Sequence, residues 1–291
     1  MSNQAYSAYH EDAEFFRVAV AFTEAQTGFN ARLIEKDYFC SLLLHGLQGA
    51  FARGLVFKGG TSLSKIHCDF YRLSEDLDFA VSVPVDSTRS VRSKAAKPFG
   101  KHVESLTTGD AGFTLCRPLR GHNNSTQYTT EIEYQSIIMG QSERIKLEIS
   151  VREPILETPK SLPCRLLLRD PFRGKTILAS IPINALSLRE TYAEKLRAAM
   201  TRREPAIRDF YDIDYAMQKG LINLEESGFV DLVRRKLSIP GNDAVDMSLD
   251  KAEILTRQLH TQLRPVLREN DYTSFDLPGV FSTVTDLAQR L

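Results

Sequence analysis

Apolar residues recur at two different spacings along the 291-residue chain. Several segments before residue 187 alternate between apolar and polar positions, which is typical of strands with one buried face. After residue 187, and in a few earlier stretches, apolar residues recur every three or four positions, as on one face of a helix. The pattern predicts strands over 55–58, 77–83, 112–117, 127–138, 144–152, 165–168 and 176–181, and helices over 11–25, 31–52, 61–67, 88–106, 188–202, 205–219, 225–237 and 250–268.

Strands concentrated in the first part and helices in the last indicate the α+β class. We expect an α+β domain over residues 1–184 and a helical domain over residues 185–291. The interval 153–184 is punctuated by prolines and predicts irregular structure.

Composition is that of an ordinary globular protein, with 42% apolar and 25% charged residues. No apolar run reaches the roughly 18 residues that a membrane span needs, and the N-terminus lacks a signal-peptide core. We therefore expect a cytoplasmic protein without a membrane partner. The four cysteines are dispersed and form no CxxC pair, so neither a zinc site nor a disulfide framework is indicated.

A glycine turn follows the first predicted strand. Gly59 and Gly60 permit a sharp bend and a close approach to a ligand, because neither carries a Cβ. Thr61 and Ser62 then open the predicted helix 61–67, whose first N–H groups could bind phosphate. The alternative is an ordinary strand–turn–helix junction. The turn is not a P-loop, since the GxxxxGK[ST] spacing is absent.

Two aspartates follow this turn in the segment DLDFAV. Asp76 and Asp78 are two positions apart, so on an extended strand their carboxylates point to one face, while Leu77 and Phe79 point to the other. Mg²⁺ prefers one or two carboxylates together with water and phosphate oxygens. The pair therefore predicts a metal site, and a solvated acidic strand edge is the alternative.

A third carboxylate lies on another alternating segment, RIKLEISV at 144–151. Glu148 is central on its polar face. If this strand neighbours the strand of Asp78, Glu148 joins the two aspartates. Otherwise it is an exposed strand glutamate.

The helix predicted over 188–202 carries a lysine at the border of its apolar face. Ser187 and Glu190 have capping-box spacing at its start. A partly buried Lys195 would need an anionic partner, which a triphosphate could provide. A surface lysine on an amphipathic helix is the alternative.

Asp209 and Asp212 share one face of the next predicted helix. By themselves they would indicate a salt-bridged surface.

Charge is balanced overall, with 37 basic and 37 acidic residues. Locally, residues 160–175 and 195–208 each carry five basic side chains and one acidic side chain, and 234–236 is a weaker basic cluster. Such clusters could hold an RNA backbone, or they could be solvated faces.

The segments FKGGTSLSK…RLSEDLDF and EKLRAAMTRREPAIRDFYDI together resemble the AbiEii/AbiGii toxins, within the DNA polymerase β-like nucleotidyltransferase superfamily. The resemblance covers roughly residues 30–220. It implies a polymerase β-like sheet followed by a helical half. It also implies a site for a nucleoside triphosphate and Mg²⁺ (or Mn²⁺), made by Gly59 to Thr61, Ser74, Asp76 and Asp78. Lys195 and either Asp209 or Asp212 match the residues that complete the family's site, and there the aspartates would orient Lys195 or the acceptor.

Two features depart from the family pattern. Fifteen residues separate Gly60 from Asp76, a longer interval than is usual in the superfamily. Shorter family members also lack much of the chain after residue 225, so the resemblance leaves that part unassigned.

The resulting hypothesis is a metal-dependent nucleotidyltransferase, the toxin of a bacterial type IV toxin–antitoxin or phage-exclusion system, with a cognate antitoxin as a possible partner. Asp76 and Asp78 would hold the metal, Glu148 would be a third ligand or a base, Gly59 to Ser62 would cradle phosphate, and Lys195 would offset charge. The resemblance favours RNA as the acceptor, with the 3′ end of tRNA as the site of transfer. The alternatives are kinase-like phosphotransfer to serine, with Ser74 as a possible acceptor, and nucleotide binding without turnover in a protein that acts through its partner.

Overall fold

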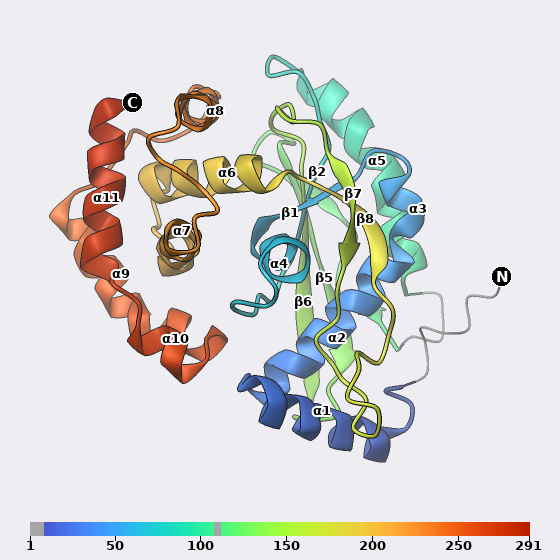
Figure 1. Ribbon diagram of the computed structural model, residues 1–291. Coiled ribbons are helices and arrows are strands. Elements are labelled where there is room, and N and C mark those ends of the chain that lie inside the picture. Colours follow the sequence, from blue (N-terminus) through green and yellow to red (C-terminus); the bar gives the residue numbers. More distant parts are fainter. Residues whose placement is uncertain (1–8, 108–111) are drawn as a thin grey trace. The chain divides into compact units, whose positions relative to one another are not determined.

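The computed structural model describes residues 9–107 and 112–291. The chain divides into two compact units, Met1–Leu186 and Ser187–Leu291, and each is described by itself (Figure 1).

The first unit is built on a mixed sheet of eight strands in its described residues, in the order β3-β5-β6-β2-β1-β8-β7, with β4 paired to β5. The pairs β2–β6 and β1–β8 are parallel, and the other pairs are antiparallel. The strands are β1 (Val56–Lys58), β2 (Leu77–Ala80), β3 (Thr114–Leu115), β4 (Arg120–His122), β5 (Gln127–Gln135), β6 (Ser142–Ser150), β7 (Lys160–Cys164) and β8 (Ile181–Ala185).

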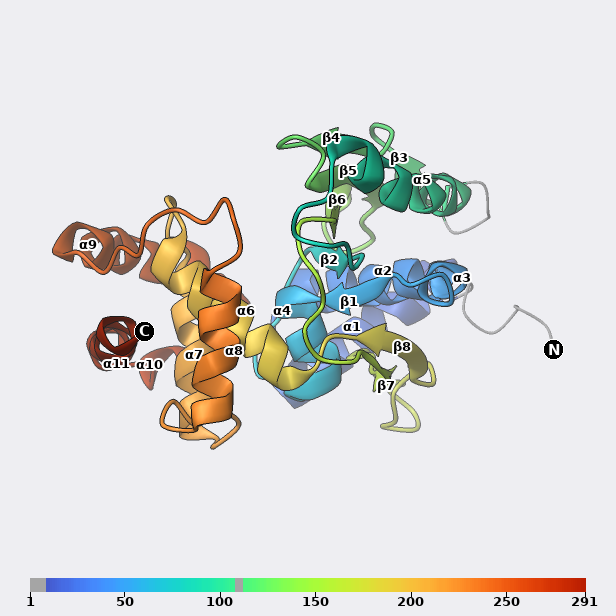
Figure 2. The ribbon, with the colours of Figure 1, turned by 90° about the horizontal axis from the view of Figure 1, so that it is seen from above.

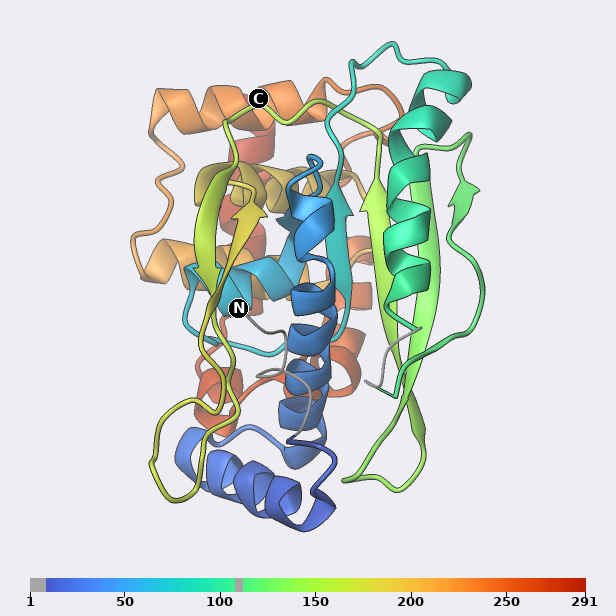
Figure 3. The same cartoon turned by 90° about the vertical axis from the view of Figure 1, so that its right-hand side faces the viewer.

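Helices lie on both faces of this sheet. One face is covered by α2, α3 and α5, and α4 lies on the other (Figures 2 and 3). The helices of this unit are α1 (Ala13–Thr27), α2 (Ala31–Gly46), α3 (Gln48–Phe51), α4 (Gly59–Ser62), a π-helical turn (Leu63–His67) and α5 (Arg89–Ser105).

Aromatic packing fixes which side of each central strand is buried. The ring of Phe79 on β2 lies 5.4 Å from Phe57 on β1 and 6.0 Å from Phe51 on α3. These apolar side chains therefore face α2 and α3. Because side chains alternate along a strand, Lys58 and Asp78 point to the opposite face.

The proline-punctuated segment differs from the prediction. Residues 165–168 and 176–181 were expected to be strands, but the strands are β7 and β8 on either side of that interval. Leu166, Leu167 and Leu168 are buried, yet they pack as irregular chain. The Leu167 N–H instead donates a 3.1 Å hydrogen bond to the Asp37 carboxylate. The prediction of a strand over 165–168 is wrong because a short apolar run is also compatible with buried irregular chain.

The second unit is helical, as expected from the spacing of its apolar residues. Ser187 caps the first helix by accepting a 2.9 Å hydrogen bond from the Glu190 N–H. The elements are α6 (Leu188–Thr201), α7 (Ile207–Gln218), α8 (Ser227–Leu237), α9 (Leu249–Gln258), a π-helical turn (Leu259–Leu263), a 3-10 turn (Arg264–Val266), α10 (Glu269–Thr273) and α11 (Leu277–Arg290).

One expected helix in this unit is too long. The α-helix predicted over 250–268 ends at Gln258. A π-helical turn and then a 3-10 turn follow, and the 3-10 turn contains Pro265, which cannot continue a regular α-helix. The last helix, α11, was not predicted, although Leu277, Val280, Val284 and Leu287 are buried at helical spacing. No helix in the described part of the chain is long and apolar enough to cross a bilayer.

Candidate functional site

A row of polar residues crosses the face of the central sheet that lies opposite α2 and α3. Lys58 pairs with Asp78, Asp78 with Glu148, and Glu148 with Thr129, on the four neighbouring strands β1, β2, β6 and β5. Directly opposed residues in a sheet point to the same side, so these four side chains share one face. The strand of Glu148 therefore neighbours the strand of Asp78, which is the first of the two alternatives that the sequence left open. Asp76 immediately precedes β2.

The glycine turn lies directly against these carboxylates. Gly59 has a φ of 77°, and a Cβ at this position would come within 3.0 Å of the Asp78 Cβ. A Cβ on Gly60 would lie 2.6 Å from Arg72 Nη2 and 3.0 Å from Ser74 Oγ. Only glycine leaves room for this approach. The chain thereby brings the turn, Ser74 and Asp78 together.

The helix after the turn begins earlier than predicted. It starts at Gly59, so Thr61 and Ser62 lie inside α4 rather than at its N-cap. The Thr61 hydroxyl donates a hydrogen bond to the Asp76 carbonyl oxygen, which ties the turn to the loop before β2. Ser62 is fully buried, and its hydroxyl has no hydrogen-bond partner among the described residues.

The long interval between Gly60 and Asp76 is folded and partly buried rather than an exposed loop. It contains the π-helical turn and the buried residues Phe70, Tyr71, Arg72 and Leu73. Arg72 is 1% exposed and donates a 3.0 Å hydrogen bond to the Leu73 carbonyl, while its other terminal nitrogen lies beside Gly60. The extra residues therefore bring a buried guanidinium to the glycine turn.

Glu148 is held by a lysine on its own strand. Lys146 Nζ lies 3.0 Å from Glu148 Oε2. Partial burial lowers the pKa of Lys146, but the hydrogen bond to Glu148 and the negative charges of Asp78 and Asp76 together raise it above its ordinary value. The cluster thus already contains one cation beside its carboxylates.

The donor set fits a hard divalent cation held by two side chains. Within residues 9–107 and 112–291, no three His, Cys, Asp or Glu side chains are grouped as metal ligands. Mg²⁺ needs only one or two protein carboxylates when phosphate oxygens and water supply the rest. Asp76 and Asp78 meet that requirement, and the nearby Lys146 shows that the cluster accommodates positive charge.

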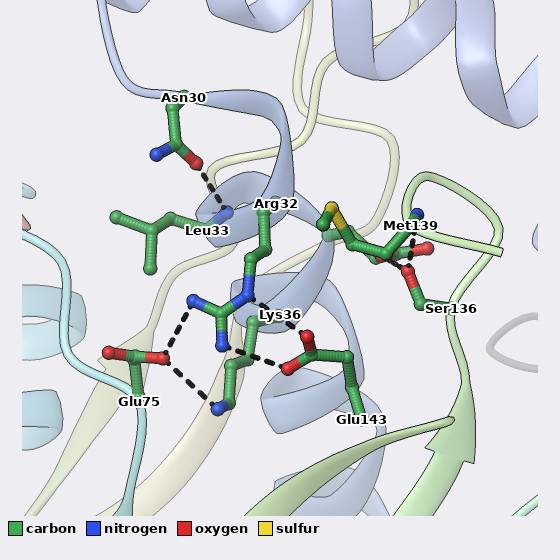
Figure 4. A network of polar contacts seen from close by, with 9 residues as sticks. Asn30, Arg32, Leu33, Lys36, Glu75, Ser136, Met139 and Glu143 are labelled. Atoms are coloured by element: carbon green, nitrogen blue, oxygen red, sulfur yellow. Dashed lines mark hydrogen bonds and ion pairs between the residues drawn. The ribbon is translucent and has the colours of Figure 1, made fainter. Parts of the chain in front are cut away.

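Helix α2 anchors the residue that precedes Asp76. Glu75 accepts hydrogen bonds from Arg32 Nη1 and Lys36 Nζ, each at 3.1 Å (Figure 4). Arg32 also donates hydrogen bonds to both carboxylate oxygens of Glu143 on β6, from Nε at 3.0 Å and from Nη2 at 2.8 Å. These hydrogen bonds, above all the one to Glu143, raise the pKa of Arg32. The network joins α2, the loop before β2 and the start of β6.

The same helix holds two further segments through neighbouring buried charges. Glu35 accepts hydrogen bonds from the Ile137 and Ile138 N–H groups in the β5–β6 turn, at 2.7 and 3.2 Å. Asp37 forms a 2.6 Å ion pair with Lys65, whose side chain is fully buried and belongs to the π-helical turn that follows α4. Residues 35–37 therefore fix three different parts of the first unit.

The second unit contains its own charged cluster. Lys195 Nζ lies 2.6 Å from Asp209 Oδ1 and 3.0 Å from Asp212 Oδ2. Asp209 also pairs with Arg202 at 2.9 Å. Both aspartates are buried, so each needs a cationic partner, and Lys195 is shared between them. The predicted site residues thus form two sets, one within each unit, and both aspartates contact Lys195.

Several residues of these sets were missed by sequence reasoning. Lys58, Arg72 and Lys146 are spaced like ordinary polar positions. Lys58 and Arg72 lie beside residues that are brought to them only by the fold, and the link of Lys146 to Asp78 and Asp76 also depends on the pairing of β6 with β2. The run Glu35-Lys36-Asp37 is the clearest sequence indication of such buried charges, because three consecutive charged residues interrupt a mostly apolar helical segment. In the structure, residues 33–44 of this helix are all buried.

The family of the chain follows from its sequence match. Residues 42–283 match the model of the AbiEii nucleotidyl transferase toxins of type IV toxin–antitoxin systems. The chain belongs to this family. The match extends well past residue 220, so the helices that the resemblance left unassigned are part of the AbiEii region. No curated protein matches the chain.

Two solved structures have a fold similar to that of this AbiEii family member. The nucleotidyltransferase toxin MenT4 from Mycobacterium tuberculosis aligns with a TM-score of 0.55 at 17% identity, covering 94% of this chain and 97% of its own. JHP933 from Helicobacter pylori aligns with a TM-score of 0.50 at 15% identity, covering 90% and 92%. These likenesses establish the α+β fold, while the residues of the site are argued from this chain alone.

Proposed function

We propose that this AbiEii family member transfers a nucleoside monophosphate from a nucleoside triphosphate to an RNA acceptor, with the 3′ end of tRNA as the favoured acceptor. The observation that carries the proposal is the contact of the Gly59–Gly60 turn with Asp78. It places a backbone able to approach phosphate beside a pair of carboxylates able to hold a metal.

In this proposal Asp76 and Asp78 would hold Mg²⁺ or Mn²⁺, which when bound neutralises the triphosphate and favours loss of pyrophosphate. The turn at Gly59 and Gly60 leaves space for the phosphates. Lys58 lies in the same row as Asp78 and adds positive charge there. Arg32 and Lys36 hold Glu75 and thereby the loop that carries Asp76.

Transfer requires an acceptor hydroxyl to attack the α-phosphorus as pyrophosphate leaves. Glu148 is the candidate to accept the hydroxyl proton, and its hydrogen bond to Lys146 holds it in place. Lys195 would offset negative charge on the transferring phosphorus, with Asp209 and Asp212 fixing its position. The cognate antitoxin that the AbiEii family implies would be the protein partner.

The test is incubation of the protein with labelled nucleoside triphosphates, Mg²⁺ and tRNA. Asp76→Asn and Asp78→Asn should each reduce labelling of the RNA by roughly 10²-fold or more, because the charge that holds the metal is lost. Asp86→Asn is a matched control, since Asp86 is exposed and follows the same strand. Phosphate-sized labelling of protein would indicate phosphotransfer instead, and bound but unconsumed triphosphate would indicate a partner-binding role. Either result would overturn the proposal.

A further inference from the structure

A hollow lined by basic side chains lies between helix α5 and the end of α3. It has a volume of about 540 Å³, and its charged lining comes from Arg53, Lys94, Lys97, Lys101 and His102. No acidic side chain lines it. None of the site residues described above contributes to it.

Helical geometry makes this face of α5 basic. Lys94, Lys97 and Lys101 follow the i, i+3, i+7 spacing of one helix face, and all three are exposed. Ala96, Phe99 and Val103 are buried against the sheet on the other face. At a rise of about 1.5 Å per residue, the three lysines cover about 10 Å along the helix.

Among the described residues, no acidic side chain pairs with the four basic residues Arg53, Lys94, Lys97 and Lys101 of this hollow. The clusters suggested by sequence differ in this respect: Arg165 pairs with Asp69 at 2.7 Å, and Arg202 pairs with Asp209. In a chain with zero net charge, the unpaired basic residues around the hollow concentrate positive potential locally.

The chemistry of the lining favours phosphate over an acidic protein. Lysine ammonium groups bind phosphates as point charges without reading bases. Protein–protein interfaces are typically depleted in lysine and enriched in aromatic residues, and no aromatic side chain other than His102 lines this hollow. The pattern is that of a backbone contact on a nucleic acid.

We propose that this hollow binds backbone phosphates of RNA. Helices α3 and α5, which border the hollow, lie on one face of the sheet (Figure 2), whereas the strand register places Asp78 and Glu148 on the opposite face. The hollow therefore contacts a part of the RNA other than the reacting end. The proposal rests on the proposed function in taking RNA as the acceptor, but binding at this surface requires no transfer.

The test uses the full chain and fluorescently labelled unfractionated tRNA, with anisotropy measured between about 50 and 200 mM NaCl. The triple variant Lys94→Ala/Lys97→Ala/Lys101→Ala should lower the affinity for tRNA by about 10-fold or more. The slope of the logarithm of the binding constant against the logarithm of the salt concentration should fall by the equivalent of about two to three phosphate contacts. The charge-matched control Arg17→Ala/Lys219→Ala/Arg257→Ala removes three exposed basic residues that lie outside this hollow and outside the basic clusters suggested by sequence, and it should bind like the unaltered chain.

Equal affinities and salt slopes for the α5 triple variant and the unaltered chain would overturn the proposal, as would equal losses in both triple variants. If the α5 triple variant keeps its tRNA affinity but loses binding to polyglutamate, the surface fits an acidic protein instead, which also overturns it. Failure of the proposed function is distinguishable, because tRNA would then bind through α5 without being labelled.

Discussion

Gly59 meets two constraints that only glycine satisfies together. Its φ of 77° is in the left-handed region, and a Cβ there would collide with the Asp78 side chain. Gly54 shares the first constraint, with a φ of 93°, but a Cβ there would meet no atom within 4 Å. Substituting alanine at Gly54 therefore tests the effect of backbone strain alone, whereas substituting it at Gly59 tests strain together with the contact with Asp78.

Gly54→Ala should lower the free energy of unfolding by about 1–2 kcal/mol through backbone strain alone. Gly59→Ala should cost about 1–3 kcal/mol more, because the added methyl group displaces Asp78, and it should also weaken triphosphate binding. Urea unfolding and nucleotide titration of both variants measure this. Identical losses of stability, with nucleotide binding intact in both, would show that the turn does not depend on its contact with Asp78.

Lys146 is the second residue whose role is testable in isolation. Replacing it with methionine removes the cation that faces Glu148, Asp78 and Asp76. Because the lysine side chain is 46% exposed, solvent screening limits the loss of stability to about 0.5–1 kcal/mol. Added Mg²⁺ should raise the melting temperature of Lys146→Met more than that of the unaltered chain, since the metal then replaces the missing charge. An equal or smaller rise would mean that Mg²⁺ binds away from these carboxylates. Lys146→Arg keeps the charge and is the control.

Among the elements, α2 binds three separate parts of the first unit, although it carries no predicted site residue. Its three consecutive charges, Glu35, Lys36 and Asp37, bind the β5–β6 turn, the residue before Asp76 and the lysine behind the glycine turn. Removing one partner of the buried Lys65–Asp37 pair would leave an uncompensated charge in the interior.

The pH dependence of stability should report on Glu35. Burial raises the pKa of its carboxyl above the ordinary value, despite the hydrogen bonds it accepts. A raised folded-state pKa stabilises the protein below the unfolded-state pKa, and this contribution is lost as pH rises through the folded-state pKa. Glu35→Gln stays neutral, and its carbonyl oxygen can still accept from Ile137 and Ile138. The variant should therefore gain stability relative to the unaltered chain as pH rises above the ordinary range of a glutamate carboxyl, measured by urea unfolding at several pH values. A difference independent of pH would contradict this.

Local periodicity explains which elements could be predicted from the sequence. The alternation around Glu148 and the helical spacing around Lys195 are properties of a single segment, and both elements form as expected. The partners of α2 could not be predicted in this way: Asp37 meets Lys65 across 28 residues and Leu167 across 130, so only the folded chain reveals them. The strands β7 and β8 were misplaced for the related reason that each contains a proline, which argues against a strand unless the sheet leaves that position free.

At the scale of the whole molecule, the charged residues proposed for transfer are divided between two compact units. The glycine turn and the carboxylates belong to residues 1–186, and Lys195 with its two aspartates belongs to residues 187–291. Each set is stabilised by contacts inside its own unit: Asp78 by its place in the sheet, and Lys195 by Asp209 and Asp212. Binding of the triphosphate and its transfer should therefore be separable.

A fragment of residues 1–186 should bind a non-hydrolysable nucleoside triphosphate with Mg²⁺ but transfer no nucleotide, because it lacks Lys195. Calorimetric titration measures the binding, labelled triphosphate with tRNA measures the transfer, and a cooperative melt of the fragment establishes that it is folded. Lys195→Met in the full chain should give the same separation, with affinity for the triphosphate retained within a few-fold and turnover reduced by roughly 10²-fold or more. Transfer by the fragment, or full turnover by Lys195→Met, would restrict the chemistry to the first unit. A folded fragment that binds no triphosphate would show instead that residues 187–291 contribute to the binding itself.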